Sequence, residues 1–379
     1  MSYPLTEEQQ LIQQNAKEFA LECVEPAAAE IDHTAAHPAD IVKKMIEQDF
    51  LGIFMPSEFG GAEAGYLSYA LIIEELSRVS GAVAAILMNH ASLAAYSINR
   101  WGSAEQKTTY LSALCQGEKL GAFALNEPGA ALGAGEHKVA AVKDGDTYVL
   151  KGRKCYVANG GVAGVYIVFA QTNPEAGAKG ISAFIVDGQS DGLSIARIIN
   201  KMGLRGCQSA ELVFDNVKVP VANLLGAEGA GLAIAAEALA ATSIAEGGMV
   251  VGIAQAAMED AVKYGKQRIQ FGRPIASFPA IQTMLAEMAT NIHMLRLAVY
   301  DAATLLENGE PFAAEAAMIK LFAARIGQSA LIDVIQIEGG YGYSQEMVAS
   351  RLYRDIKGAV IKNSSIDFPE KIIAGNLLA

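Results

Sequence analysis

The arrangement of apolar residues changes twice along this 379-residue chain. Up to about residue 120, apolar side chains recur every three or four residues, which is the pattern of amphipathic helices. Between about 121 and 225 they form short runs separated by glycine, as in β-strands. Helical spacing then returns over long segments with short connections, which predicts an antiparallel bundle. The sequence therefore predicts an α+β chain of three domains: helical (1–120), β (121–225) and helical (226–379).

Capping and turn residues predict where these elements begin and end. Thr6, followed by Glu7 and Glu8, starts a helix that we expect to end at Pro26. Asp144-Gly145 lies between two alternating runs and predicts a β-hairpin with a type I′ turn, which needs positive φ angles. The other strands are expected over 165–170, 181–186 and 211–214. The other helices are expected over 41–49, 66–79, 84–96, 104–114, 232–264, 281–306, 313–335 and from about 345.

Composition and missing motifs argue against several classes of protein. Hydrophobic residues make up 52% of the chain and charged residues 18%, as in a compact globular protein. A net charge of −12 provides no basic surface, so no nucleic-acid partner is expected. The chain has no P-loop and no glycine fingerprint of a Rossmann fold. It also lacks HExxH and CxxC, so no metal site is expected.

The cysteines and the first residues predict the compartment. The four cysteines show no pairing pattern, so we expect reduced thiols in a cytoplasmic protein. The first eight residues are polar and acidic, unlike a signal or transit peptide. No run of apolar residues reaches the roughly 18 that are typical of a transmembrane helix, so no membrane span is expected.

Two segments far apart in the sequence suit a large anionic cofactor. Residues 268–274, Arg-Ile-Gln-Phe-Gly-Arg-Pro, are basic and place an aromatic residue at a helix boundary. Residues 336–343, Gln-Ile-Glu-Gly-Gly-Tyr-Gly-Tyr, hold three glycines just after an apolar helix. Glycine lets backbone amides approach phosphate closely, and arginine supplies a fixed fork of donors. Together they indicate a site for a phosphate-bearing ligand.

With six further motifs in order, these segments resemble the acyl-CoA dehydrogenase family of flavoproteins nearly end to end. The further motifs lie at 5–9, 55–61, 74–78, 102–107, 125–130 (Leu-Asn-Glu-Pro-Gly-Ala) and 224–229, with 201–205 (Lys-Met-Gly-Leu-Arg) in support. The resemblance implies a helical N-terminal domain, a middle β-barrel-like domain and a C-terminal four-helix bundle. It also implies a homotetramer with FAD between the β domain and the bundle, completed by a neighbouring subunit.

The resemblance also implies the cofactor contacts. Arg268 and Phe271 reach the pyrophosphate and adenosine of FAD in the adjacent subunit. Gln336, Gly339 and Gly340 contact the dinucleotide from their own side. Taken alone, Phe271 would more often pack in a core and Arg268 would be a solvated helix end. The remaining cofactor-binding positions that the resemblance implies are Leu125, Asn126, Leu132, Tyr156, Ala158 and Ser365.

Three of these positions depart from the family pattern. Asn126 and Ala158 stand where threonines usually contact the flavin, and Leu132 stands where a serine faces flavin and thioester. Asn126 can still donate and accept a hydrogen bond, but Leu132 and Ala158 cannot. We therefore expect FAD to be held by shape and backbone contacts. Leu132 and Ser243 are the expected substrate-binding positions, and both replace polar groups of the family.

The catalytic base is the largest departure. The family carries a glutamate shortly after an Arg-Asp-Ala-Lys run, and here Arg354-Asp355-Ile356-Lys357 leads to Asn363. An amide has no basic form, so Asn363 cannot remove the α-proton of a thioester. In some relatives the base lies on the first bundle helix, but the matching residues here are Thr242 and Ser243. Glu246, one helical turn beyond Thr242, is the nearest carboxylate, and a solvated or interface glutamate is the alternative.

These features predict an FAD-dependent acyl-CoA oxidoreductase that works as an enoyl-CoA reductase and exchanges electrons with an electron-transferring flavoprotein. An enoyl thioester is electrophilic and needs no strong base, whereas α-proton removal would lose about 10²–10⁴-fold in rate. Three alternatives stay open. They are a conventional dehydrogenase with a relocated base, a non-redox acyl-CoA lyase, and a non-catalytic partner subunit of a hetero-oligomer.

Overall fold

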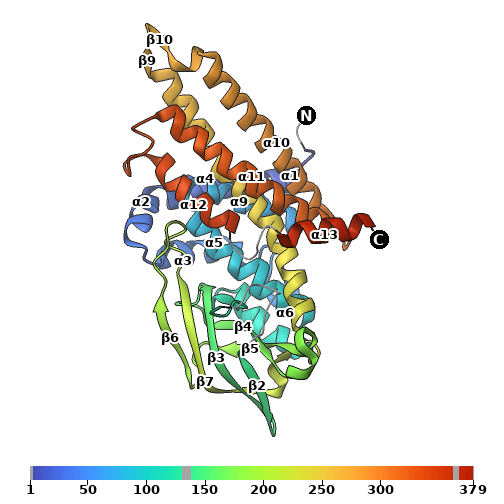
Figure 1. The fold of residues 1–379 in the computed structure, drawn as a ribbon. Helices are drawn as coiled ribbons and strands as arrows, with labels where there is room; N and C mark the ends of the chain where they lie inside the picture. The colour runs from blue at the N-terminus through green and yellow to red at the C-terminus, as the bar shows by residue number, and fades with distance from the viewer. Residues whose placement is uncertain (1–2, 130–137, 362–366, 379) are drawn as a thin grey trace.

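The computed structural model describes residues 3–129, 138–361 and 367–378 (Figure 1). Helices from both ends of the chain form the upper part of the molecule in Figure 1, and the β-sheet forms the lower part. The long helix α9 (Gly231–Gln267) runs from the sheet to the opposite end of the molecule. The fold is therefore organised along this helix.

The N-terminal part of the chain is helical, as predicted. Its α-helices are α1 (Glu7–Phe19), α2 (Glu25–Thr34), α3 (Ala39–Glu47), α4 (Gly65–Val79), α5 (Gly81–Met88), α6 (Tyr96–Trp101), α7 (Ala104–Gln106) and α8 (Ser112–Cys115). π-helical turns join several of them, at Ala20–Val24, Asn89–Ala95 and Lys107–Leu111. Thr6 caps α1 in a capping box with Gln9, which confirms the predicted start.

The predicted helix end at Pro26 is wrong, because the chain continues as α2 to Thr34. Pro26 lies in the first turn of α2, where a missing N–H breaks no helical hydrogen bond. The preceding turn, Ala20–Val24, is π-helical and wider than an α-helical turn. This local widening accommodates the proline ring, so the helix bends without stopping.

The middle part is a mixed eight-stranded sheet in the order β6-β7-β3-β2-β4-β5-β8, with β1 beside β4. The strands are β1 (Gly121–Ala124), β2 (Ala140–Asp144), β3 (Thr147–Ala158), β4 (Val165–Gln171), β5 (Ile181–Asp187), β6 (Leu193–Ile198), β7 (Ser209–Pro220) and β8 (Leu224–Leu225). Residues of β3, β4, β5 and β7 pack in a core of their own, in which the rings of Tyr148 and Phe184 meet edge to face. The strands predicted at 165–170, 181–186 and 211–214 are confirmed.

The predicted hairpin joins β2 to β3, but its turn is not of type I′. Asp144 pairs with Thr147, so Gly145 and Asp146 are the two turn residues. Gly145 has a φ of 58°, whereas Asp146 is not among the residues with positive φ. Glycine at the first turn position alone is the pattern of a type II′ turn.

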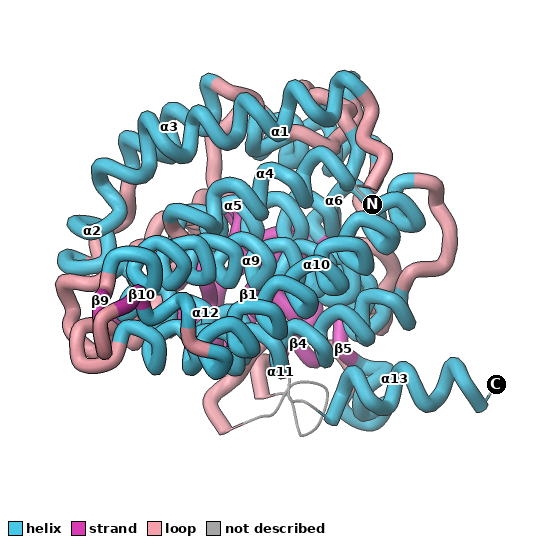
Figure 2. The backbone as a smooth tube through the Cα atoms, turned by 90° about the horizontal axis from the view of Figure 1, so that it is seen from above, coloured by secondary structure: helices cyan, strands magenta, loops and turns pink. Residues whose placement is uncertain are grey.

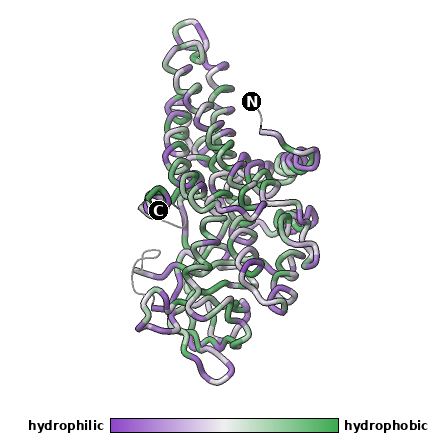
Figure 3. Tube along the Cα trace, turned by 90° about the vertical axis from the view of Figure 1, so that its right-hand side faces the viewer, coloured by the Kyte–Doolittle hydropathy of each residue, from purple (hydrophilic) through white to green (hydrophobic). Residues whose placement is uncertain are grey.

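The C-terminal helices pack closely around α9. They are α10 (Pro279–Glu307), α11 (Ala313–Glu338), α12 (Val348–Ile361) and α13 (Asp367–Leu378), and a short hairpin of β9 (Ile269–Gln270) and β10 (Arg273–Pro274) joins α9 to α10. Figure 2 shows α9 between α4 and α5 on one side and α11 and α12 on the other. In the projecting bundle of Figure 3, hydrophobic and hydrophilic residues alternate along each helix. The polar positions face outward and the apolar ones face the neighbouring helices.

Glycine permits this close packing. A Cβ at Gly252 would clash with the backbone carbonyl of Glu74 on α4, and one at Gly247 would lie 2.7 Å from the Val299 side chain on α10. At the sheet end, a Cβ at Gly231 would lie 2.7 Å from the carbonyl oxygen of Ile181. The absence of side chains at these positions brings three elements into contact with α9.

The sheet is fastened to the bundle where residues 201–205 meet α12. The backbone N–H of Leu204 donates to the carboxylate of Asp355 at 2.6 Å. A Cβ at Gly203 would collide with the carbonyl of Arg354, whose guanidinium forms a two-pronged ion pair with Asp32 on α2. Burial raises the pKa of Asp355 to about 6. The segment 201–205 and the Arg354-Asp355 pair, which are distant in the sequence, therefore connect the sheet domain, α12 and α2.

Two helical stretches, Gly81–Trp101 and Gly231–Gln267, are long and apolar enough to cross a membrane by length and composition. The most apolar 18-residue window of the first stretch is entirely buried within the protein. In the second stretch, 72% of the corresponding window is buried. Their apolar side chains therefore face the interior of this fold, as in the core helices of a folded domain.

We expect Gly252→Ala to destabilise the protein by about 1–3 kcal/mol, because the added methyl group has to displace backbone of α4. Gly265→Ala, in the same helix, is the control. Its Cβ would meet Ala276 at an ordinary 3.4 Å, so we expect a gain of up to about 1 kcal/mol from helix propensity. Chemical denaturation measures both. Equal effects of the two substitutions would contradict the proposed role of Gly252 in packing.

Candidate cofactor and substrate site

The loop after β1 carries the residues predicted to face the flavin. It forms one wall of a cavity of about 390 Å³, lined by Asn126, Glu127, Pro128, Gly129, Cys155, Tyr156, Arg197 and Glu211. Tyr156 is 63% exposed with a φ of 53°, so its ring stands out from β3. Leu125, at the start of the loop, and Ala158, two residues after Tyr156, are buried. The side chain of Ala158 offers no hydrogen bond at this place.

A buried ion pair holds this loop in position. The ammonium of Lys154 on β3 lies 2.7 Å from the carboxylate of Glu127 and donates to the carbonyl of Leu125 at 2.9 Å. Glu127 also accepts hydrogen bonds from the backbone N–H groups of Lys138 and Val139. Burial lowers the pKa of Lys154 to about 8, although Glu127 opposes the shift. A charged pair inside the sheet thus fixes the backbone that is predicted to touch the flavin.

The two phosphate-binding motifs lie together at the far end of the bundle. They line a cavity of about 520 Å³, formed by Tyr264, Arg268, Gln270, Ile275, Ile337, Glu338, Gly339, Gly340 and Tyr341. Arg268 is exposed there, whereas Gln336 is exposed but is not among the residues that line this cavity. Among the described residues, no atom lies within 4 Å of the positions that a Cβ would take at Gly339 or Gly340, so their backbone is open to a ligand. This cradle and the nearby guanidinium fit the pyrophosphate of a dinucleotide.

Phe271 lies at the tip of the hairpin and is 93% exposed, so the alternative of core packing is wrong. Phe271 and Gly272 have φ angles of 51° and 77°, as in a two-residue turn with both φ angles positive. Behind the tip, the guanidinium of Arg273 lies 4.3 Å from the centre of the Phe278 ring. The turn therefore presents an aromatic ring to whatever lies beyond the tip.

These two cavities are separate within one copy of the chain. They share no lining residue: one lies on the loop after β1 and on β3, β6 and β7, and the other lies where α9 and α11 end. The expectation that a neighbouring subunit completes the FAD site stays a prediction. Because Arg268 and Gly339–Gly340 line the same cavity, both motifs would contact the same FAD. The sequence-based assignment of these motifs to opposite subunits does not fit this arrangement.

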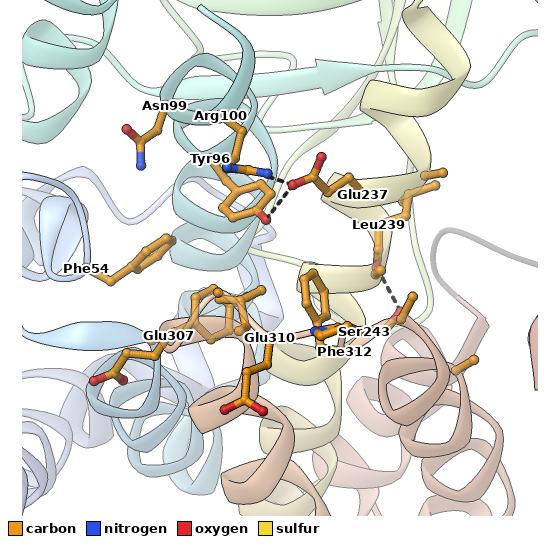
Figure 4. Close-up of a pocket in the computed structure, with 18 of the residues that line it drawn as sticks. Phe54, Tyr96, Asn99, Arg100, Glu237, Leu239, Ser243, Glu307, Glu310 and Phe312 are labelled. Atoms are coloured by element: carbon orange, nitrogen blue, oxygen red, sulfur yellow. Dashed lines mark hydrogen bonds and ion pairs between the residues drawn. The ribbon is translucent and has the colours of Figure 1, made fainter. Parts of the chain in front are cut away.

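A cavity of about 900 Å³ opens beside the first half of α9 (Figure 4). Elements α4, α6, α11 and α13 and the connection between α10 and α11 complete its walls. Aromatic and small side chains line it, among them Phe54, Tyr66, Tyr96, Phe312, Ala236, Ala240 and Ala317. Ser243, a predicted substrate-binding residue, also lines it, and its hydroxyl donates to the carbonyl of Leu239 at 2.8 Å. This cavity is the candidate site for the acyl thioester.

Charged side chains in the cavity wall are organised by hydrogen bonds. The carboxylate of Glu237 accepts from Tyr96, Arg100 and Trp101 at 3.2, 2.7 and 3.0 Å, and Figure 4 shows the first two pointing toward it. Burial and the charge of Glu237 raise the pKa of Tyr96. These contacts join α6 to α9 and fix one side of the cavity.

Glu246, the carboxylate considered as a catalyst, is only 2% exposed, so the alternative of a solvated glutamate is wrong. It forms a buried ion pair with Lys320 on α11, and Lys320 lines the cavity. The hydroxyl of Thr242, one turn earlier, lies 3.2 Å from the carbonyl oxygen of Ser92 and 3.1 Å from its hydroxyl oxygen, and it donates a hydrogen bond to this pair of acceptors. Whether Glu246 acts on the substrate stays a prediction, because Lys320 lines the cavity and Glu246 is not among its lining residues.

Leu132, Asn363 and Ser365 lie outside the described residues, so their roles stay predictions. Within the ranges that the structure describes, no group of three or more His, Cys, Asp or Glu side chains is arranged to hold a metal ion. All four cysteines are free thiols, Cys23 and Cys155 partly exposed and Cys115 and Cys207 buried.

Three functional candidates escaped sequence reasoning: Lys154, Lys320 and Glu338. Lys320 does carry a signal, because it falls in the same buried helical stripe as Ala316, Ala323 and Gly327. A charged residue in such a stripe predicts a buried partner. The identity of that partner depends on which helix packs alongside, and the periodicity of one helix does not specify this.

The whole chain matches models of one family. The N-terminal, middle and C-terminal domains of acyl-CoA dehydrogenase match residues 6–118, 122–217 and 229–374. The chain belongs to the acyl-CoA dehydrogenase family. This confirms the resemblance, the fold class and the assignment as an FAD-dependent oxidoreductase of acyl-CoA thioesters. The boundaries at 120 and 225 stay a prediction.

Relatives and solved structures cover the full chain. It is 42% identical to a 3-(aryl)acrylate reductase of Clostridium sporogenes, over 98% of this chain and 99% of the relative. It is 37% identical to the caffeyl-CoA reductase-Etf complex subunit CarC of Acetobacterium woodii, over 98% and 99%. The solved structure of butyryl-CoA dehydrogenase from Megasphaera elsdenii has a TM-score of 0.97 at 37% identity and covers all of both chains.

Filling the phosphate cradle tests its role. We expect Gly340→Leu to lower the FAD content of the purified protein at least tenfold, because the side chain would occupy the space left for the pyrophosphate. Gly375→Leu, at a glycine of α13 with equally open surroundings, is the control and should retain FAD. Absorbance of the flavin relative to protein measures the content. Full FAD occupancy in Gly340→Leu would contradict the assignment.

A buried carboxyl in the same cavity makes stability depend on pH. Burial, and then the charge of Asp260, raise the pKa of Glu338 to about 7. The contribution of the protonated Glu338 carboxyl to the free energy of unfolding is complete below pH 4.5, and it is lost as the pH rises through 7. We expect the free energy of unfolding of Glu338→Gln, relative to that of the wild type, to rise by up to about 3 kcal/mol between pH 5 and pH 8. Chemical denaturation at pH 5 and pH 8 measures this rise, and Glu346→Gln, at an exposed position, is the control. A stability difference between Glu338→Gln and wild type that does not change with pH would contradict the prediction.

Proposed function

We propose that this protein is an enoyl-CoA reductase that receives electrons from an electron-transferring flavoprotein and works in the cytoplasm as a homotetramer. The observation behind this proposal is Asn363, which stands where the family has its catalytic carboxylate while the phosphate-binding motifs are retained. The missing base does not select a direction by itself, but it favours a substrate with a large driving force toward reduction. Two relatives named as reductases, one of them a subunit of a complex with Etf, support this direction and this partner.

The residues of this chain divide the work of binding and orientation. Arg268, Gly339 and Gly340 hold the phosphates, and the loop anchored by Glu127 and Lys154 places backbone groups near the flavin. The cavity beside α9 binds the acyl group and shields it from water. FAD, when bound, supplies hydride transfer at the β-carbon of the acyl group. The chain thereby fixes the thioester without offering a base at position 363.

The proton balance explains the preference for an unsaturated substrate. Reduction adds a hydride to the β-carbon and a proton to the α-carbon, and the enolate formed in between is basic enough to take its proton from water or a weak acid. The reverse reaction starts with removal of an unactivated α-proton, which needs a positioned base. Asn363 can donate a hydrogen bond but cannot take this proton. A substrate with a large driving force toward reduction therefore suits the site.

A conventional dehydrogenase is the second candidate, because Glu246 lies on α9 one turn beyond Thr242. Its carboxylate is paired with Lys320, so the ammonium competes with a substrate proton for it. The similarity to a butyryl-CoA dehydrogenase is compatible with this candidate. A non-catalytic partner subunit would be distinguished by purified protein that is colourless and takes up no added FAD.

Stopped-flow measurement of the two half-reactions tests the proposal. We expect a short enoyl-CoA to reoxidise the reduced protein at least tenfold faster than the matching saturated acyl-CoA bleaches the oxidised protein. Asn363→Glu should speed the bleaching by about 10²–10⁴-fold, because it restores a base, whereas Asn363→Gln should not. Fast bleaching by saturated acyl-CoA in the wild type would overturn the reductase assignment in favour of a dehydrogenase.

A further inference from the structure

Lys320, in the wall of the substrate cavity, forms a buried ion pair with Glu246 in otherwise apolar helices. Lys320 on α11 and Glu246 on α9 are 7% and 2% exposed. Ala240 and Ala317, which line the same cavity, belong to the same two helices. Folding does not require such a pair, because apolar residues of similar volume usually stabilise a core at least as well. A costly pair that reaches a ligand cavity indicates a role in binding.

The surroundings of this pair are polar as well. The hydroxyl of Tyr66 on α4 lines the cavity region and donates to the carbonyl of Ala241 at 2.7 Å. The ring of Tyr69 lies 5.1 Å from that of Tyr66, and its hydroxyl is buried without a hydrogen-bond partner. Burial raises the pKa of Tyr66, and the nearby Glu246 adds to the shift. The place where α4, α9 and α11 meet is therefore a cluster of buried hydrogen-bonding groups.

The other acidic side chains of the cavity have different surroundings. Glu237 is held by Tyr96, Arg100 and Trp101, and Glu307 accepts from the backbone of Leu67. Glu63 accepts from Ser57 and Glu310 from Asn308, both at exposed positions. Lys320 differs from these acidic side chains. Among the described residues that line the cavity, it is the charged residue that is buried together with its ion-pair partner, Glu246.

The chemistry of the pair selects the kind of group that it can bind. An anionic substituent would be attracted by Lys320 but repelled by Glu246. A neutral hydroxyl can accept a hydrogen bond from the ammonium of Lys320, which lines the cavity, and it meets no net charge because Glu246 behind the ammonium balances it. Hydrogen bonds to charged groups in a site shielded from water are about twice as strong as neutral ones. The pair is therefore suited to a hydroxyl group.

The shape of the cavity indicates what carries the hydroxyl. Its volume of about 900 Å³ lies at the upper end of what small-molecule sites usually have. Phe54, Tyr66, Tyr96 and Phe312 contribute flat aromatic surfaces, and alanines on α9 leave width between them. Aromatic rings pack favourably edge to face or offset against such walls. A ring fills this space better than a short alkyl chain.

We propose that Lys320, its charge balanced by Glu246, recognises a hydroxyl group on a ring-bearing acyl group, so that the protein prefers a hydroxyaryl thioester to the unsubstituted one. This inference rests on the proposed function, because it assigns the cavity beside α9 to the acyl part of the substrate. It names the substrate class of that site and the two residues that select it.

Calorimetric binding of two saturated thioesters to the FAD-loaded protein tests the inference. The probes are 3-(4-hydroxyphenyl)propanoyl-CoA and 3-phenylpropanoyl-CoA, which differ only in the hydroxyl. We expect the hydroxylated probe to bind about tenfold more tightly, the effect of one hydrogen bond to a charged group. Equal affinities, or tighter binding of the unsubstituted probe, would overturn the inference.

A double variant assigns the preference to the pair. Glu246→Leu combined with Lys320→Met removes both charges at once at similar volume, so no unpaired charge is left buried. We expect the ratio of the two affinities to fall to about twofold or less. Lys43→Met combined with Glu47→Leu, on the exposed face of α3, is the matched control and should keep the tenfold ratio. An unchanged ratio in the Glu246/Lys320 variant, with FAD still bound, would overturn the assignment to these residues.

Calorimetry needs no turnover, so the inference and the proposed function fail separately. Equal affinities for the two probes, together with rapid reduction of the matching enoyl-CoA esters, would contradict the inference alone. A tenfold preference, together with no reduction of either enoyl-CoA, would contradict the proposed function alone.

Discussion

The length and close packing of α9 determine where every part of the site lies. At its first residue the helix touches the sheet through Gly231, and at its other end it leads into Arg268. Between these ends Gly247 and Gly252 let α4, α10 and α11 approach. The phosphate cradle lies where this helix ends, and the flavin-side loop lies in the sheet domain. The two form separate cavities in one chain, and completion of the cofactor site by a neighbouring subunit stays a prediction.

Buried charges are the second constraint on this molecule. Glu127 with Lys154 fixes the loop after β1, and Glu246 pairs with Lys320, which lines the acyl cavity. Glu74, buried on α4, receives hydrogen bonds from Arg296 and Tyr300 of α10. Each pair costs desolvation free energy that an apolar core would not need. In the first two cases the charged groups lie at a candidate binding surface, which gives a functional reason for the cost.

The sequence predicted the elements well because their signals are local. The capping residue Thr6, the hairpin at Asp144-Gly145 and the long helical stripes all lie within a few residues of the structure they specify. The predicted end at Pro26 was wrong because a proline in a first turn does not stop a helix that has widened before it. The turn type was wrong because the strand register placed Gly145 first and Asp146 second in the turn.

The site was predicted less completely because its contacts are between distant segments. Motif order identified Arg268, Gly339 and Gly340, but only the parallel course of α9 and α11 shows that they line one cavity. The partner of Glu246 lies 74 residues further along the chain, beyond what the periodicity of either helix can specify. Exposure of Phe271 likewise depends on the hairpin standing away from the bundle.

We infer that this chain retains its phosphate-binding residues but has no base for the α-proton of the substrate. The decisive experiment follows by NMR the exchange of the α-protons of a saturated acyl-CoA with deuterium from solvent, on the FAD-loaded protein. We expect exchange no faster than without protein, although calorimetry shows that the thioester is bound. Rapid exchange that Glu246→Gln abolishes would contradict it, because a base would then be at work in the site.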